Sequence, residues 1–184
     1  VSMIENSHTK VIDASTAHRT DKGWIYGLPE LGNGQRDRIK NSSRVANPGC
    51  HATGFILALY PLIQTGILPK DYPISCTSIT GYSGGGKKLI AKYEDESTPD
   101  INSPKPYGLK LQQKHLPEMK TVTGLDHPPI FLPVVANYYK GMAVSVTLAS
   151  RMLHKKMSAF DIHELLSEYY TGEHFVRVMP YNDD

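Results

Sequence analysis

Cys50 stands at a position where thiol chemistry is favoured. It follows Asn-Pro-Gly at residues 47–49 and precedes an apolar run at 55–60. Proline and glycine favour a sharp turn, and the backbone N–H groups of a helix's first turn have no partner within the helix. Their positive end favours a thiolate, and the same groups can hold an oxyanion once sulfur has attacked a carbonyl. A buried cysteine that only fills space is the alternative, but the surrounding pattern favours a nucleophile.

A helix after Cys50 would carry this thiol. The apolar residues that follow recur at helical spacing and share one face: Phe55, Ile56, Leu59, Leu62 and Ile63. Gly66 is expected to end the helix, and Pro69 prevents its continuation.

The segment before Cys50 predicts a strand, a loop and a connector. A tail of a helix is expected at residues 1–6, followed by a short buried strand at 10–13 and a polar loop at 14–19. This order is typical of the end of a Rossmann-type strand, where ligand groups gather. The polar, glycine-containing stretch 20–43 is expected to be mostly loop, with a short helix at 35–40.

The segment after the Cys50 helix predicts strands and one exposed excursion. A β-like run at 74–79 ends in Gly81, and residues 91–111 have weak patterning and several prolines. Residues 130–137 and 141–149 read as two strands, which we expect to pair antiparallel through the short connection between them.

The C-terminal part predicts a capped helix and a final strand. Ser158 can cap a helix whose Asp161 lies three residues further on. Its buried stripe consists of Ile162, Leu165, Leu166 and Tyr169. Residues 175–179 read as a strand.

The composition excludes several classes of protein. The chain is 40% hydrophobic and 21% charged, which is ordinary for one folded core, and its net charge of +2 offers no basic surface for nucleic acid. The longest apolar stretch contains Pro61 and is too short to span a membrane, and the N-terminus lacks a signal pattern, so we expect a cytoplasmic protein. Cys50 and Cys76 are not expected to form a disulfide in that compartment.

Four motifs together make the chain similar to a known family. They stand at residues 26–31 (Tyr-Gly-Leu-Pro-Glu-Leu), 44–50 (Arg-Val-Ala-Asn-Pro-Gly-Cys), 81–87 (Gly-Tyr-Ser-Gly-Gly-Gly-Lys) and 115–119 (His-Leu-Pro-Glu-Met). In this order they resemble the N-acetyl-gamma-glutamyl-phosphate reductases, in their shorter bacterial form. The resemblance extends over essentially all 184 residues.

The resemblance implies a fold and a domain organisation. The implied fold class is α+β, with a mixed, largely antiparallel sheet and flanking helices as in the catalytic domain of glyceraldehyde-3-phosphate dehydrogenase, plus a remnant of an α/β Rossmann domain. Residues 1–45 would be the remnant and connector of the NADP-binding Rossmann domain, and 46–184 the catalytic and dimerisation domain. No Gly-x-Gly-x-x-Gly loop opens the chain, so we expect a middle-to-late piece of a longer enzyme, inactive by itself. A homodimer or homotetramer is expected.

The resemblance also implies the chemistry. The family reduces a small acyl phosphate with NADPH in arginine biosynthesis, and Cys50 would attack the acyl carbon and form a thioester. His115 aligns with the family's catalytic histidine and would take the thiol proton and later return one.

Further residues are assigned by the same resemblance. Arg19, Lys114 and Glu118 are the candidates for binding the substrate, although Glu118 could equally orient His115 or begin a helix. Ser83, Gly84 and Gly85 are the candidates for the wall beside the cofactor, since glycines let a backbone come close to a ligand.

No metal site is expected. No two histidines have the i, i+4 spacing of a helical metal site, and no second thiol stands near Cys50. His51 is expected to shape the wall of the site.

Three alternatives remain open at this stage. The first is a sister enzyme that reduces an acyl phosphate of a lysine route. The second is an assembly module without turnover, since the chain lacks the nicotinamide-binding half. The third is a cysteine hydrolase, which would share the nucleophile but need no NADPH.

Overall fold

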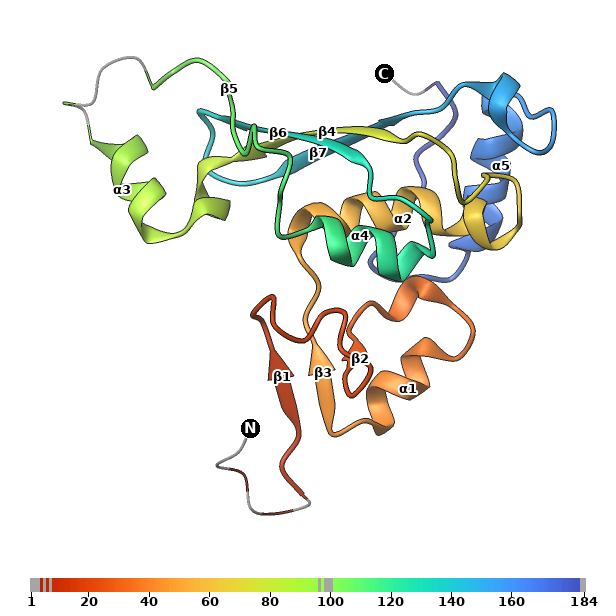
Figure 1. The fold of residues 1–184 in the computed structure, drawn as a ribbon, viewed down its shortest axis with the longest axis horizontal. Coiled ribbons are helices and arrows are strands. Elements are labelled where there is room, and N and C mark those ends of the chain that lie inside the picture. The colour runs from red at the N-terminus through yellow and green to blue at the C-terminus, as the bar shows by residue number, and fades with distance from the viewer. Residues whose placement is uncertain (1–3, 5, 7, 96, 98–100, 183–184) are drawn as a thin grey trace.

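The structure is a computed structural model that describes residues 4, 6, 8–95, 97 and 101–182. The helix tail expected at residues 1–6 lies outside the described residues apart from positions 4 and 6. Two sheets organise the described chain, a small one and a larger one with helices against it (Figure 1). In the described part of the chain, no helix is both long enough and apolar enough to cross a membrane.

The small sheet is parallel and has three strands. They are β1 (Val11–Asp13), β2 (Ile25–Tyr26) and β3 (Arg44–Ala46), in the order β1-β3-β2. A strand forms at 11–13 as expected, but the expected burial is wrong, since Ile12 is 74% exposed. Helix α1 (Gln35–Asn41) confirms the helix expected at 35–40. The strand β2 was not expected, because two residues are too few to show a period.

The larger sheet is mixed and has four strands. They are β4 (Ser75–Gly81), β5 (Lys105–Pro106), β6 (Ile130–Ala136) and β7 (Met142–Thr147), in the order β5-β6-β4-β7. The strand β4 pairs parallel with β6 and antiparallel with β7, and β5 pairs antiparallel with β6.

The expected pairing of β6 with β7 is wrong, because β4 lies between them. The connection between β6 and β7 crosses the end of β4 and bonds to it, with Gly81 N–H donating to Gly141 O and Tyr82 N–H to Tyr138 O. A Cβ at Gly81 would lie 2.7 Å from Tyr138 O, so only glycine lets the connection pass this close.

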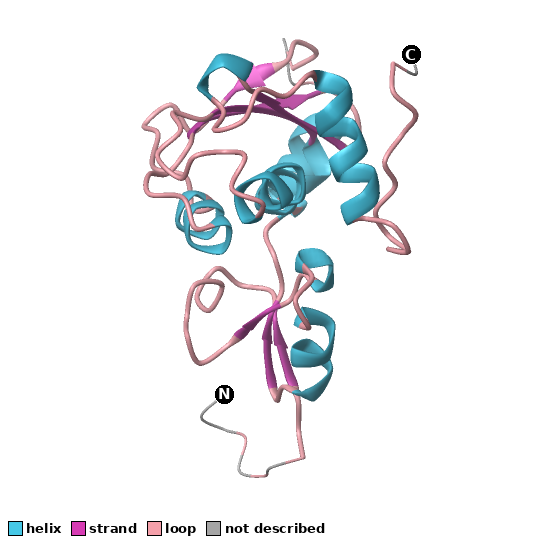
Figure 2. Cartoon of the chain, turned by 90° about the vertical axis from the view of Figure 1, so that its right-hand side faces the viewer, coloured by secondary structure: helices cyan, strands magenta, loops and turns pink. Residues whose placement is uncertain are grey.

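Three helices cover one face of this sheet. They are α2 (Cys50–Gln64), α4 (Leu116–Thr123) and α5 (Ala159–Tyr169), and Figure 2 shows them gathered beneath the strands. The predicted apolar face of α2 is fully buried and forms the centre of the core, and Gly66 follows the helix end at φ +69°. The predicted cap of α5 is also confirmed, as Ser158 and Asp161 form a capping box.

A proline inside α2 is compensated from α5. Pro61 has no N–H, so the carbonyl of Leu57 lacks its usual helical donor. The buried hydroxyl of Tyr170 donates to Leu57 O at 2.6 Å and takes the place of that donor. The C-terminal end of α5 is thereby tied to the middle of α2.

The remaining segments lie outside this core. Helix α3 (Lys87–Glu94) begins before the excursion expected at 91–111 and lies on an arm at one end of the sheet (Figure 1). Among the described residues of that excursion, only Lys105–Pro106 joins a sheet. The strand expected at 175–179 is wrong: the segment pairs with no strand in the described part of the chain, and Phe175 is 85% exposed.

The outer face of the larger sheet is uncovered by any described helix. Side chains on this face include Ile79, Ile130 and Leu132, which are 39%, 62% and 39% exposed. The large residues of β7 point inward instead, since Val144 and Val146 pack against the core while Ala143, Ser145 and Thr147 are exposed.

Candidate active site

A cavity of about 750 Å³ lies where α2 begins and β4 ends. Its walls come from the start of α2, the end of β4 with the loop after it, one residue of β6, helix α3 and the segment 101–115. The loop after β1 contributes Arg19. The volume suits a small-molecule ligand. Most of the residues singled out in the sequence meet at this cavity.

Cys50 is the first residue of α2 and is exposed at the cavity. Gly49 is the N-cap, and its backbone N–H donates to Glu118 Oε1 at 2.7 Å. A Cβ at Gly49 would lie 2.5 Å from both Arg19 Nη1 and His115 Nδ1, so the turn before the thiol requires glycine. The expected turn and helix around Cys50 are both present.

His115 is brought to Cys50 from α4. It is the N-cap residue of that helix and is 5% exposed. One of its ring nitrogens lies within 4.8 Å of Cys50 Sγ. Its Nδ1 is buried without a hydrogen-bond partner among the described residues and lies 3.7 Å from Glu118 Oε2. The geometry therefore brings the two residues close enough for proton transfer directly or through one water.

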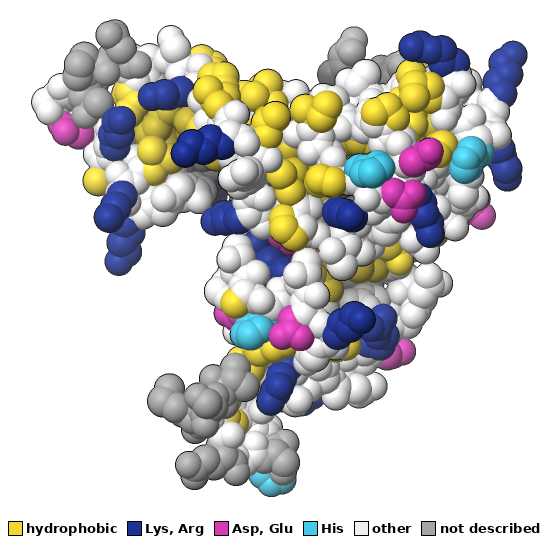
Figure 3. Space-filling view, in the orientation of Figure 1, with side chains coloured by type: hydrophobic (Ala, Val, Ile, Leu, Met, Phe, Trp, Pro, Cys, Tyr) yellow, Lys and Arg dark blue, Asp and Glu magenta, His cyan; other side chains and the backbone are white. Residues whose placement is uncertain are grey.

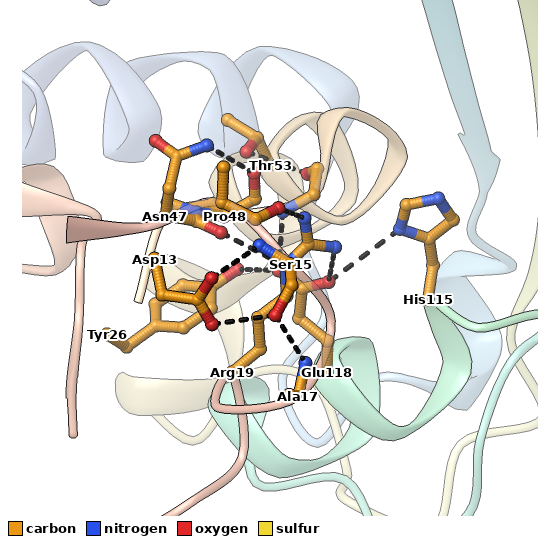
Figure 4. Close-up of polar contacts among 12 residues, drawn as sticks. Asp13, Ser15, Ala17, Arg19, Tyr26, Asn47, Pro48, Thr53, His115 and Glu118 are labelled. Carbon is orange, nitrogen blue, oxygen red and sulfur yellow. Dashed lines mark hydrogen bonds and ion pairs between the residues drawn. The ribbon is translucent and has the colours of Figure 1, made fainter. Parts of the chain in front are cut away.

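Glu118 does not line the cavity, but its polar contacts join segments that do (Figure 4). Its carboxylate is almost fully buried and accepts hydrogen bonds from Gly49 N–H, from Tyr26 Oη at 2.7 Å and from Arg19 Nη1 at 3.2 Å. Desolvation raises the pKa of Glu118, but the donors and the positive charge around the carboxylate outweigh burial, so this pKa lies below its ordinary value. Glu118 is therefore a buried anion that holds three parts of the chain together.

Arg19 is held in place by several acceptors. Besides its bond to Glu118, its Nε donates to Asn47 O at 3.0 Å and its Nη2 to Ala14 O at 3.1 Å. The side chain is 9% exposed and still contributes to the cavity wall. A guanidinium has five N–H donors, so two remain for a ligand.

His51 lies in a buried hydrogen-bond chain, and one of its ring nitrogens is within 4.8 Å of Cys50 Sγ. Its Nδ1 is 2.8 Å from Ser78 Oγ and its Nε2 is 2.9 Å from Tyr107 Oη. Burial, with the neighbouring His115 and Lys114 charges, lowers the pKa of His51 to about 4, so the ring is neutral at pH 7. It meets the His115 ring edge to face, with centroids 5.2 Å apart, and forms part of the wall.

Tyr107 was missed by sequence reasoning. Burial raises its pKa, and the nearby Cys50 contributes to the same shift. The residue stands in a stretch without periodic pattern, so nothing in the sequence marks it. Tyr26 was likewise not singled out by itself, although it begins the first of the four family motifs.

The glycine loop after β4 and several lysines lie at or near the cavity, but not all of them line it. Gly84 and Gly85 line the cavity, whereas Ser83 is beside it and is not part of the lining. Three exposed lysines line the cavity: Lys92, Lys105 and Lys114. Lysine and arginine side chains are prominent on the arm that carries α3 (Figure 3). Among the described lining residues there is no carboxylate, so the cavity favours anionic ligands.

Cys76 has surroundings that differ from those of Cys50. It is fully buried on β4, and desolvation raises its pKa to about 11. Such a thiol is a core residue and not a nucleophile at neutral pH.

Comparisons with known proteins match both the sequence and the fold. A family model described as "Semialdehyde dehydrogenase, dimerisation domain" matches residues 50–183. An N-acetyl-gamma-glutamyl-phosphate reductase 2 of Nostoc sp. is 45% identical over 188 residues, covering 100% of this chain and 58% of that protein. A protein of the same name from Pseudomonas putida is 43% identical over 180 residues, covering 98% and 58%. The chain thus spans less than two thirds of the length of these relatives.

Solved structures show the same architecture. Aspartate semialdehyde dehydrogenase II from Vibrio cholerae superposes with a TM-score of 0.64 at 18% identity, covering 86% of this chain and 52% of that one. The enzyme from Francisella tularensis gives 0.64 at 14% identity, covering 87% and 56%. At these identities the likeness concerns the fold alone, and it confirms the expected α+β class with a mixed sheet and flanking helices.

Proposed function

The chain belongs to the semialdehyde dehydrogenase dimerisation-domain family, and on that premise we propose that it carries the catalytic thiol of an N-acetyl-gamma-glutamyl-phosphate reductase. The proposed reaction reduces N-acetyl-glutamyl 5-phosphate to N-acetyl-glutamate 5-semialdehyde, with release of phosphate, in arginine biosynthesis. One observation carries the proposal: Cys50 Sγ and a ring nitrogen of His115 lie within 4.8 Å of each other in a cavity that favours anions.

Cys50 is the proposed nucleophile. Its thiol proton passes to His115, directly or through one water, and Sγ attacks the acyl carbon of the substrate. The backbone N–H groups of Cys50 and His51, in the first turn of α2, have no partner within the helix and are available to the oxyanion that forms. The C–O bond to phosphate then breaks and leaves a thioester on Cys50.

His115 serves both halves of the proposed cycle. It takes a proton when the thioester forms and returns one when the aldehyde is released and the thiol is restored. Glu118 supports this role because it lies 3.7 Å from His115 Nδ1 and also holds Gly49, the residue before the nucleophile. We therefore propose that Glu118 positions the site, in preference to a direct contact with the substrate.

Positive charge is the proposed basis of substrate binding. The substrate carries a phosphate and a carboxylate, and Arg19 and Lys114 both line the cavity. Arg19 retains two free donors and a fixed plane, which suits an oxyanion. Lys114 is exposed and contributes a mobile charge.

The cofactor implied by the family is a nicotinamide dinucleotide, and we propose NADPH. Its bound nicotinamide would supply the hydride that reduces the thioester. The residues present fit this group in part, since the glycine loop at Gly84 and Gly85 forms an open wall of the cavity and Lys92 adds charge at its rim. Ser83, beside that wall, completes the proposed cofactor contact.

The first half of the reaction provides the test, because it needs no nicotinamide. The chain is mixed with N-acetyl-gamma-glutamyl phosphate, quenched with acid and analysed by mass spectrometry, while released phosphate is measured in parallel. We expect one acyl group per chain on the peptide containing Cys50, and one equivalent of phosphate.

Two variants complete this test. Cys76→Ala should still form the adduct, and Cys50→Ser should not, since a hydroxyl is hardly ionised at neutral pH. An adduct on any other residue, or none in folded protein, would overturn the assignment of the nucleophile.

A further inference from the structure

Three side chains of types that bind transition metals lie close together at the N-terminal end of α2. Cys50 Sγ, one ring nitrogen of His51 and one of His115 all lie within 4.8 Å of one another. The two histidines are 4% and 5% exposed, whereas the cysteine is open to the cavity. The cluster therefore combines a fixed pair of imidazoles with an accessible thiol.

The donor set selects one class of cation. A thiolate with two imidazoles suits Zn²⁺ and related thiophilic divalent cations, whereas Mg²⁺ and Ca²⁺ require oxygen ligands. The described lining of the cavity offers no carboxylate to such hard cations, and its lysines disfavour them. A thiophilic cation can still bind here, because its bond to sulfur offsets the repulsion from the lysines.

In each histidine, the ring nitrogen that would face away from a metal lies near a polar side chain, hydrogen-bonded in His51 and at 3.7 Å in His115. Ser78, which does not line the cavity, lies 2.8 Å from His51 Nδ1, so Nε2 is the nitrogen on the cavity side. Glu118 lies 3.7 Å from His115 Nδ1, which leaves Nε2 of that ring for a ligand. Metal-binding histidines commonly have such a second partner, which fixes the ring and its tautomer.

The distances require only a modest adjustment. In a tetrahedral zinc site, adjacent ligand atoms lie about 3.3–3.6 Å apart, so the three groups must approach by roughly 1 Å. His51 Nε2 must give up its bond to Tyr107, whose hydroxyl can turn to water in the cavity. Three protein ligands leave a fourth position for water or an anion.

We propose that Cys50, His51 and His115 form a binding site for a thiophilic divalent cation such as Zn²⁺, which inhibits the thiol when bound. Binding forms a metal–sulfur bond and releases the thiol proton to solvent, with no change of oxidation state. The cation engages the nucleophile and its proposed base together, so the free thiolate is lost. The site needs neither substrate nor nicotinamide, so it stands independently of the proposed reaction.

Cobalt provides a direct readout of the ligands. The chain is titrated with Co²⁺ under reducing conditions, and the sulfur-to-cobalt charge-transfer band and the visible bands of tetrahedral Co²⁺ are recorded. Zn²⁺ is then added to displace the cobalt, and a chromophoric chelator in competition gives its affinity. We expect one cation per chain and a charge-transfer band that is absent from Cys50→Ser.

The histidine pair separates this site from a thiol that binds metal alone. His51→Phe should weaken Zn²⁺ binding at least tenfold, and His51→Gln provides a second, polar replacement if the phenylalanine variant does not fold. His127→Gln, at an exposed histidine, should bind as the parent does. In the parent chain, Zn²⁺ should also protect Cys50 from alkylation, and a chelator should reverse the protection.

Two results would overturn the proposal. One is the absence of a charge-transfer band from folded parent chain at saturating Co²⁺. The other is unchanged Zn²⁺ affinity in a folded His51 variant, which would show that the buried pair does not take part.

Discussion

At the scale of single residues, Glu118 does the most to define the site. Its buried carboxylate accepts from Gly49, Tyr26 and Arg19, which belong to three separate parts of the chain. Each of these donors would be left buried or misplaced without it, and hydrogen bonds to a charged group are the stronger kind. The proposed nucleophile and base are thus oriented by a residue outside the cavity.

The substitution Glu118→Gln tests this arrangement. It removes the charge and turns an amide N–H₂ toward existing donors, so we expect the free energy of unfolding to fall by about 2–3 kcal/mol. Alkylation of Cys50 should also become slower, because the turn at Gly49 loses its anchor. Urea unfolding and iodoacetamide kinetics measure the two effects.

A matched control is available on α5. Glu168 is exposed, and Glu168→Gln should change stability by no more than about 0.5 kcal/mol and leave alkylation unchanged. If Glu118→Gln behaved like this control, Glu118 would not hold the site together.

Cys76 gives a prediction about pH. Burial raises its pKa from the ordinary value of 9.0 to about 11. The folded state therefore keeps the thiol neutral while the unfolded state ionises, so the stability that Cys76 contributes is present below pH 9.0 and is lost as pH rises toward 11. The stability difference between the parent and Cys76→Ala should shrink over this range in urea unfolding.

Other titrating groups occur in both proteins and cancel in that difference. A difference that stays constant or grows with pH would show that the buried thiol does not titrate as inferred. Formation of the Cys50 adduct should be unaffected in Cys76→Ala at neutral pH.

The sequence is informative about some site residues and silent on others. Cys50 is marked by local turn chemistry and His115 by a motif, and both lie at one cavity. From the sequence, Glu118 could bind substrate, orient His115 or begin a helix, and only its partners in the fold distinguish these roles. Tyr107 cannot be found from the sequence, because its place beside Cys50 depends on a contact between distant segments.

At the scale of elements, strong periodicity and caps predict well. The helix after Cys50 and the capped helix at Ser158 both form where expected, because each has an apolar face and clear end signals. The stripe of α5 that was expected to be buried is only half-buried. Strand existence was also predictable for β4, β6 and β7. Their pairing was not, because adjacency in sequence favours a hairpin, and the close passage at Gly81 is visible only in three dimensions.

The hydrogen bond from Tyr170 to α2 can be tested together with Pro61. Tyr170→Phe leaves the carbonyl of Leu57 without its donor, so we expect the free energy of unfolding to fall by about 1–3 kcal/mol. Pro61→Ala restores a helical N–H to that carbonyl. In the Pro61→Ala background, Tyr170→Phe should therefore cost about 1 kcal/mol less.

A double-mutant cycle in urea measures this coupling. Tyr169→Phe provides the control, because its hydroxyl donates to Leu31 O and not to α2, so its cost should be independent of Pro61. Equal costs of Tyr170→Phe in both backgrounds would contradict the compensation.

At the scale of the whole molecule, one face of the larger sheet lacks a helix in the described chain. Exposed Ile79, Ile130 and Leu132 share this face with small residues of β7. An antiparallel or mixed sheet can leave one face to solvent, but a face with large apolar groups favours association. We expect the chain to form a homodimer or homotetramer through this sheet, with well over roughly 1,000 Å² buried.

Sedimentation at micromolar concentration tests the assembly. The parent chain should be at least a dimer, and Leu132→Lys should shift it toward monomer because a charge would be buried at the contact. Thr121→Lys, on the exposed surface of α4, should leave association unchanged. A parent chain that remains monomeric as its concentration rises would show that this face is not the interface.

Cys50 and His115 are proposed to act together as a nucleophile and its proton acceptor. The most direct measurement is the rate at which iodoacetamide alkylates Cys50 at neutral pH, in a Cys76→Ala background with folding checked by circular dichroism. We expect His115→Asn to slow this reaction about tenfold or more, and His127→Gln to react at the parent rate. Equal rates in folded His115→Asn and its parent would contradict the claim that His115 activates the thiol.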